Sequence, residues 1–322
     1  MKRAAILTVL VLGVFMIALF APTAAAITAK GVPDVKAGDY AEYELKMPSM
    51  SDAYTNATFV SSDKVTVEKS EKITVDGKQV DCWVTKAVTH YEIKGSSSEG
   101  GMTVTIDMKG DSTIQTWLTK DTWAEVKSIS DSDTYSKMDF PDGIPYITDS
   151  ETETQDTTTS TAKTMPVGPK KTISVGDAWT ESGNYTETSV TKTREKTGGT
   201  WGDWTTTTTT TNTTQKNKYK AESEVEVTVP AGKFTCIKIR TNPDDTSGAK
   251  DYNYVDAKGV PVKMENIDED GKTTMTMELK SYSYGGGGSS SEKKKSFLPG
   301  FEAFMVLAAG LVAVVLVRKF KK

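Results

Sequence analysis

The sequence predicts a mostly β protein with two tandem antiparallel β-units, an N-terminal signal peptide and one C-terminal transmembrane helix. Three observations support this prediction. Polar and apolar residues alternate along many segments, one strand–turn–strand segment recurs 154 residues later, and each chain end joins an apolar run to basic residues. We expect each β-unit to be a curved sheet or half-barrel.

The first element is a secretory signal over residues 1–26. Lys2 and Arg3 precede an apolar run over residues 4–20, and a proline and three alanines ending at Ala26 follow it. A charged region, an apolar region and small residues in this order predict cleavage after Ala26. The alternative is an uncleaved N-terminal anchor, and both alternatives export the middle of the chain.

The last element is an apolar span over residues 297–317. As a helix, its 21 residues would be about 31 Å long, enough to cross a hydrocarbon core of about 30 Å. Basic residues beside a span resist translocation, so the tail should stay in the cytoplasm. The residues that set this topology are Arg318, Lys319, Lys321 and Lys322.

Pro299, Gly300 and Phe301 stand where this span begins, behind a signal peptide at the other end of the chain. This arrangement resembles the PGF-CTERM sorting signal of archaeal surface proteins. The resemblance implies that an archaeosortase-type enzyme removes the span and leaves the protein on a membrane lipid. The alternative is an ectodomain that keeps its transmembrane anchor.

The exported part, residues 27–296, carries 33 basic and 42 acidic residues, a net charge of −9. This balance argues against nucleic acid as a partner, because nucleic-acid binding rewards basic patches. Strand-like alternation is common in it: Ala41, Tyr43 and Leu45 fall on one face and the charged residues between them on the other. Antiparallel sheets with one solvated face give this pattern.

An internal repeat divides this part into copy one, residues 35–148, and copy two, residues 172–284. Residues 73–83 align without a gap to residues 227–237, and each segment is a strand, a glycine-containing turn and a cysteine-containing strand. A Gly-Asp pair precedes each segment, at Gly38 and Gly176, and residues 117–127 match residues 254–264 more loosely. Chance similarity between hairpins is the alternative to duplication.

Two segments are expected to lack a core. Residues 149–171 hold few apolar residues, many threonines and two prolines, so we expect a linker between the copies. Residues 285–296 are rich in glycine, serine and lysine, which is typical of a flexible tether.

Copy two also resembles the lipoprotein-carrier fold of the LolA/LppX-like group. Residues 229–234 and 254–264 carry this resemblance. It implies a curved antiparallel sheet around an apolar cavity that can hold acyl chains. The chain shows no obvious amphipathic helices that could line such a cavity.

Few residues suggest chemistry. Cys82 and Cys236 hold equivalent places in the repeat, so they form a disulfide or are two separately buried thiols. His90, the one histidine, has no Gly-x-Ser-x-Gly elbow beside it, and we expect a half-exposed strand residue. Asp268 and Asp270 form half of a calcium loop, but Met277 stands where the loop requires glutamate. We therefore expect no catalytic residue, metal or cofactor.

Export makes glycosylation of three sequons plausible, at Asn56, Asn184 and Asn212. The threonine run over residues 205–211 is either a long strand, which we favour, or an O-glycosylated tract. Trp201 and Trp204 either fill the edge of a core, which we favour, or stack on sugar rings.

Together these features predict a non-enzymatic cell-surface protein that displays a β-rich ectodomain through a C-terminal anchor. Its expected partners are membrane lipid, the processing enzyme, and glycans or other envelope proteins. The alternative function is an envelope carrier of lipid or another apolar ligand, as the LolA-like resemblance implies, and a secreted hydrolase is a third.

Overall fold

The computed structural model describes residues 27–32, 34–48, 55–99, 102–140 and 149–283, and most of these residues lie in β-strands. The predicted signal peptide, the predicted tether and the apolar span lie outside these ranges. Within the described ranges, no helix has the length and apolar character needed to cross a bilayer. The strands are β1 (Ala29–Lys30), β2 (Tyr40–Lys46), β3 (Thr55–Val75), β4 (Lys78–Glu99), β5 (Met102–Thr119), β6 (Glu125–Asp139), β7 (Ser150–Ala162), β8 (Thr172–Ile173), β9 (Ala178–Thr197), β10 (Thr200–Trp201), β11 (Thr205–Val229), β12 (Gly232–Thr241), β13 (Lys250–Asp256), β14 (Pro261–Ile267) and β15 (Thr273–Ser283).

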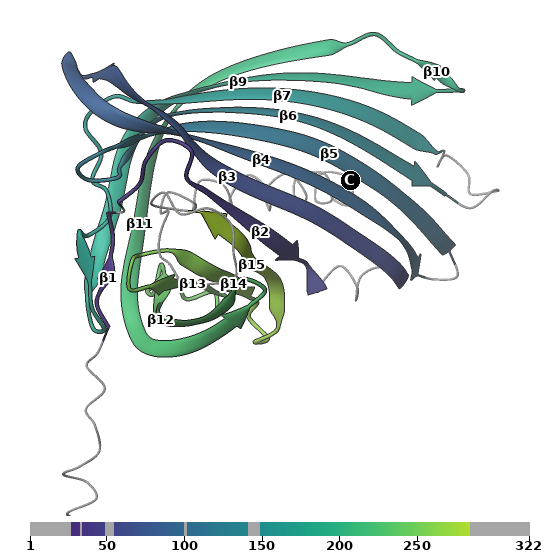
Figure 1. Ribbon diagram of the computed structural model, residues 1–322. Helices are drawn as coiled ribbons and strands as arrows, with labels where there is room; N and C mark the ends of the chain where they lie inside the picture. Colours follow the sequence, from purple (N-terminus) through teal and green to yellow (C-terminus); the bar gives the residue numbers. More distant parts are fainter. Residues whose placement is uncertain (1–26, 33, 49–54, 100–101, 141–148, 284–322) are drawn as a thin grey trace, which may run out of the picture.

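Twelve of these strands form one closed antiparallel ring. The order in the large sheet is β10-β9-β11-β12-β13-β14-β15-β2-β3-β4-β5-β6-β7, and pairing of β7 with β9 closes it, leaving β10 outside the ring. Figure 1 shows the long strands β3 to β7 and β9 as a curved wall, with the short strands β12 to β15 opposite and β11 bending from one to the other. The mostly β prediction is confirmed, but the two copies share one sheet and do not form separate half-barrels.

The predicted linker over residues 149–171 is partly wrong, because it contains β7. This strand pairs with β6 over residues 150–161 and with β9 over residues 151–162. Its lack of apolar residues suggested a linker, yet threonine suits a pleated strand, and backbone pairing on both sides needs no apolar side chain. Copy one as predicted, residues 35–148, ends before β7; with β7 added to it, each copy supplies six ring strands, β2 to β7 from copy one and β9 and β11 to β15 from copy two.

The Gly-Asp turns of the two copies have the same backbone geometry. Gly38 has φ = 91° and Gly176 has φ = 92°, a left-handed conformation that glycine adopts without strain. The Gly38 N–H donates to the carbonyl of Val67 at 2.8 Å, and the Gly176 N–H donates to the carbonyl of Ala221 at 2.8 Å. A register shift follows Val67 in β3 and Ala221 in β11.

The cysteine strands also match. Cys82 pairs with Thr119 and Cys236 with Asp256, and each partner is the last residue before the next turn. The Thr119 side chain accepts the N–H of Ala124, and the Asp256 side chain accepts the N–H of Val260. This equivalence agrees with the predicted repeat; descent from a duplication stays a prediction.

The core lies inside the ring and at its ends. The largest buried cluster joins β2, β3 and the short strands of copy two, and a second holds Cys82, Val84 and Trp117. A small two-stranded sheet of β1 and β8 places Ala29 and Ile173 against Tyr219 in a third cluster.

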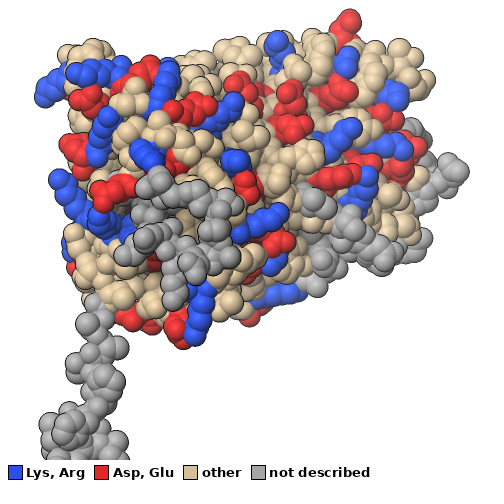
Figure 2. Space-filling model, viewed as in Figure 1, with Lys and Arg blue, Asp and Glu red and all other residues tan. Residues whose placement is uncertain are grey.

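The inner face of the long wall is rich in hydroxyl groups. One row of directly paired residues crosses six neighbouring strands and consists of Thr89, Ser112, Ser132, Asp156, Thr191 and Thr207. Thr89 and Ser132 are buried, whereas Val88 on the other face of β4 is 45% exposed. The outer face carries interspersed basic and acidic side chains, as Figure 2 shows for one side of the molecule.

Candidate functional site

A cavity of about 150 Å³ lies inside the ring and is the candidate site. Both copies and the segment between them contribute to its wall. Its polar and aromatic lining consists of Lys30, Glu125, Glu181, Ser182, Trp123, Trp179, Tyr185, Tyr219, Gln215, Asn217 and Asn253. A second hollow of about 370 Å³ lies over the C-terminal parts of β4 and β6 and the N-terminal part of β5. Its charged lining residues are Lys94, Asp107, Lys137 and Asp139.

Two tyrosines mark equivalent points where the copies join. The Tyr43 hydroxyl donates to the carbonyl of Pro261 at 3.2 Å, and the Tyr185 hydroxyl donates to the carbonyl of Glu125 at 3.0 Å. Pro261 and Glu125 are the first residues of β14 and β6, which hold equivalent places in the two copies. Each tyrosine thus fastens the first strand of one copy to the fifth strand of the other.

The cavity lies where copy two departs from this symmetry. Tyr43 follows Asp39 of its Gly-Asp turn by four residues, whereas Tyr185 follows Asp177 by eight. Four extra strand residues displace the turn by about 13 Å. The added stretch of β9 carries Trp179 and Glu181, and it pairs with an equally extended part of β11.

Glu181 is the carboxyl group of this added stretch. It stands opposite Asn217 on β11, and its Oε1 accepts a hydrogen bond from Trp179 Nε1 at 3.0 Å. Burial disfavours the charged form and raises the pKa of Glu181 to about 7, against the opposing effect of the Trp179 hydrogen bond. The Trp179 ring stacks on Tyr219, with centroids 5.2 Å apart.

Copy one contributes Glu125 and Trp123 from the turn before β6. Burial raises the pKa of the Glu125 carboxyl, and both Glu125 and Glu181 help to raise the pKa of Tyr185. Trp123 has φ = 56°, a left-handed conformation that costs free energy for a bulky residue. In the matching turn of copy two, Gly259 has φ = 75°, which glycine adopts without this cost. Trp123 is 2% exposed, and its indole Nε1 has no hydrogen-bond partner among the described residues.

The segment after β7 covers the cavity. Val167 and Ser182 exchange two backbone hydrogen bonds, at 2.7 and 3.1 Å. A Cβ at Gly168 would lie 2.3 Å from the carbonyl oxygen of Thr122, so only glycine allows this close approach. The second half of the predicted linker is therefore a wall of the site.

The two cysteines are not bonded to each other. Cys82 and Cys236 are both free and fully buried, and they belong to different apolar clusters. Burial raises the pKa of Cys82 to about 11 and that of Cys236 to about 12. The predicted disulfide pair is thus replaced by its alternative, two separately packed thiols, because the matching hairpins bury their sulfurs in different parts of the core.

His90 is exposed on the outer face of β4. Its Nδ1 lies 2.8 Å from Asp111 Oδ1 on β5, and Ser62 stands opposite it on β3. No hydrogen bond joins Ser62 and His90 in the described chain. The three side chains form a row on a solvated sheet face, where the strand ladder already uses the backbone N–H groups that an oxyanion hole would need.

The sequons that the structure describes lie on neighbouring strands. Asn184 on β9 and Asn212 on β11 are exposed, and their side-chain oxygens accept hydrogen bonds from Thr214 and Thr186 across the strands. The threonine run over residues 205–211 begins β11, so the strand prediction is confirmed. The side chain of Asn56 and the processing residues Ala26, Pro299, Gly300, Phe301, Arg318, Lys319, Lys321 and Lys322 lie outside the described residues.

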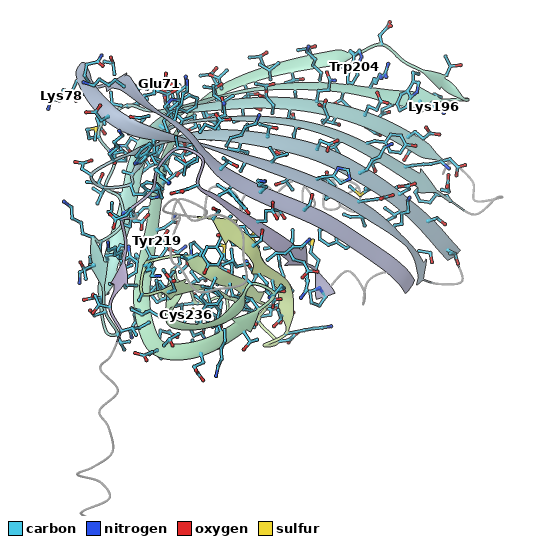
Figure 3. All side chains as sticks on the ribbon, viewed as in Figure 1. Glu71, Lys78, Lys196, Trp204, Tyr219 and Cys236 are labelled. Carbon is cyan, nitrogen blue, oxygen red and sulfur yellow. The ribbon has the colours of Figure 1, made fainter. Side chains whose placement is uncertain are left out.

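Trp201 and Trp204 do not fill a core edge as predicted. Their rings lie 4.9 and 4.7 Å from the Arg194 guanidinium carbon, and Arg194 Nε donates to Glu153 at 2.7 Å. Figure 3 places Trp204 near Lys196 at the far end of the wall, away from Tyr219. This charged and aromatic ladder joins β7, β9 and the β10 region, far from the cavity.

The residues of the cavity were not predicted as a site. Trp179, Glu181 and Trp123 have no motif around them. One signal was available: the spacing between the Gly-Asp turn and the next buried tyrosine differs by four residues between the copies. The described residues contain no group of three or more metal-binding side chains.

Comparison with known proteins adds little. No protein-family model matches the chain, and no curated protein matches it. One solved structure, from Bacteroides fragilis and provisionally described as an exported protein with a YmcC-like fold, covers 79% of this chain and 99% of its own, at 12% identity and a TM-score of 0.29. A likeness at this level carries no argument about function.

Proposed function

We propose that this chain is a non-enzymatic envelope protein that displays a β-barrel outside the membrane and binds a small ligand inside it. The observation that carries the binding role is the cavity where the four-residue extension of copy two breaks the symmetry of the ring. The sequences of both chain ends support export and anchoring. Membrane lipid, a processing enzyme of the archaeosortase type, and glycans are the partners that fit this arrangement.

The size of the cavity favours a compact ligand over an acyl chain. Pockets for drug-sized ligands are roughly 300–1,000 Å³, while a buried cavity of roughly 150 Å³ can hold benzene. The hydroxyl-rich row across the long wall also makes that wall a poor surface for acyl chains, because stripping water from hydroxyl groups costs free energy. We therefore favour small-molecule binding over the lipid carriage that the LolA-like resemblance implies.

Hydrolysis is less well supported. The Ser62, His90 and Asp111 row lacks a cleft that could hold a substrate and exclude water. In the cavity, Glu181 accepts a hydrogen bond from an indole N–H, and neither histidine nor cysteine is among the residues that line it. A binding protein needs neither feature.

Filling the cavity tests the binding role. We expect Asn217→Phe to abolish saturation-transfer NMR signals from a mixture of small amines, alcohols and aromatic probes, because the new ring occupies the space beside Glu181. Asn212→Phe, on the exposed face of the same strand, is the matched control and should keep them. Equal signals from both variants, or no signal from the unaltered full-length protein in detergent, would count against binding in the cavity.

A further inference from the structure

We propose that the cavity takes a compact organic cation, held by the Glu181 carboxylate and by the aromatic rings that line the same space. This inference rests on the proposed binding function and adds the chemical class of the ligand. It follows from the charge of the wall, the aromatic lining and an unpartnered indole donor.

The wall of the cavity is acidic. Glu181 and Glu125 are its two carboxyl groups, contributed by β9 and β6. One lining residue is basic, Lys30, and its ammonium group already pairs with Asp34. A cationic ligand would meet charge of the opposite sign, whereas an anionic ligand would meet like charge.

An enclosed carboxylate is costly unless a positive charge accompanies it. Among the described residues, the Trp179 indole is the one side chain that hydrogen-bonds to Glu181. That bond leaves Oε2 of the carboxylate available to a ligand. A bound cation would therefore offset the loss of hydration that burial imposes on the Glu181 carboxylate.

The aromatic lining suits an organic cation better than a metal ion. Trp179 and Tyr219 stack with an interplanar angle of 25°, and Tyr185 and Trp123 line the same space. Cations attract aromatic faces, and quaternary ammonium groups are recognised by rings of this kind. Calcium sites usually gather several carboxylates, and the described residues hold no group of three or more His, Cys, Asp or Glu side chains that could bind a metal ion.

The indole N–H of Trp123 gives a second requirement. It is buried and has no partner in the described part of the chain, so an acceptor on the ligand can satisfy it. Cavities near 150 Å³ hold about six non-hydrogen atoms by comparison with benzene. The ligand class is thus a small ammonium compound that carries an oxygen, and choline is a suitable probe.

The test compares choline with 3,3-dimethyl-1-butanol, a neutral compound of the same shape. Full-length protein in detergent is titrated at pH 8, with calorimetry and tryptophan fluorescence as readouts. We expect saturable choline binding and an affinity for the neutral analogue that is at least tenfold lower. Glu181→Gln should weaken choline at least tenfold, while Glu187→Gln, on the same strand outside the cavity, should leave it unchanged.

The pH dependence supplies a test without mutation. The titratable groups around Glu181 are Glu125 from β6, Tyr185 and Tyr219 from β9 and β11, and Lys30 with its partner Asp34. Because the pKa of Glu181 is raised to about 7 by burial, choline affinity should fall about tenfold between pH 8 and pH 6, while binding of the neutral analogue stays constant.

The outcomes separate the two proposals. Equal affinity for both compounds, or full displacement of choline by potassium or calcium at matched ionic strength, would overturn the organic-cation inference and leave cavity binding standing. No binding of either compound, together with the absence of NMR signals described above, would overturn both. Circular dichroism of Glu181→Gln checks its fold, and the comparison of the two compounds on the unaltered protein does not depend on that variant.

Discussion

Glu181 shows what the added stretch of β9 contributes. Tyr43 and Tyr185, the matching tyrosines of the two copies, are buried and donate to backbone carbonyls. Glu181 lies four residues before Tyr185, in the stretch that has no counterpart in copy one. It lines the cavity and accepts a hydrogen bond from the Trp179 indole, so the extension places a carboxyl group there.

The raised pKa of Glu181 predicts how stability depends on pH. An acid whose pKa is higher in the folded state stabilises the fold most when protonated, so this contribution is present below pH 4.5 and is lost as the pH rises to about 7. The loss should be about 1–3 kcal/mol, since one pKa unit corresponds to about 1.4 kcal/mol and the group is partly exposed in the cavity.

We therefore expect Glu181→Gln to be more stable than the unaltered protein at pH 8 and to differ little at pH 4.5. Urea denaturation at both pH values, without added amines, measures the difference. Glu187→Gln is the control for removing a charge from β9. A Glu181→Gln variant that gains nothing between pH 4.5 and pH 8 would show that the carboxyl is not buried as described.

At the scale of elements, β7 decides whether the sheet closes. Its residues are mostly threonine, serine and glutamate, and its side chains contribute one member, Ala162, to a core cluster. Its stability therefore comes from backbone pairing with β6 and β9 and from hydroxyl contacts such as Thr158 with Ser189 at 3.1 Å. Composition alone could not distinguish such a strand from a linker.

Proline at position 158 tests this strand. Thr158 pairs with Ser130 on one side and Ser189 on the other. Thr158→Pro removes a ladder N–H and leaves a carbonyl unpaired, which costs about 1–3 kcal/mol before any steric strain. Thr158→Val keeps a β-branched side chain and should cost less than about 1 kcal/mol.

The difference between these two variants in urea midpoints is the measurement. If residues 149–171 were a linker, both substitutions would be nearly neutral, since a linker has no ladder to interrupt. If β7 is a ladder strand, Thr158→Pro should have a clearly lower urea midpoint than Thr158→Val.

At the scale of the whole molecule, the ring joins the two copies at both junctions. Tyr43 fastens β2 to copy two, and Tyr185 fastens β9 to copy one. The cavity lies at the junction that carries the four-residue extension. Tyr185 therefore both joins the two copies and lines the cavity proposed to bind a ligand.

Export of this ring is a prediction about the whole chain. Intact mass spectrometry of protein from its native host should show loss of residues 1–26, because the sequence there predicts a cleaved signal. Added mass should map to peptides that contain Asn184 or Asn212, which lie exposed on β9 and β11. Protease added to intact cells should digest the barrel; a protected barrel with an unprocessed N-terminus would contradict display.

The sequence by itself determined the local features of this protein. Alternation at Ala41, Tyr43 and Leu45 predicted β2, because neighbouring residues encode the period of side chains along a strand, and the Gly-Asp pairs at Gly38 and Gly176 marked equivalent places in the repeat. The repeat predicted one hairpin in each copy, and the structure has these hairpins between β3 and β4 and between β11 and β12.

Only the tertiary structure decided how the sheet closes and what its interior holds. Pairing of β15 with β2 joins strands from the two ends of the described chain, and no residue in either strand signals it. Cys82 and Cys236 remain apart because each copy buries its own hairpin in a different cluster. The cavity around Glu181 exists because four extra residues in β9 are matched by four in β11, and this offset has meaning only once both strands stand side by side.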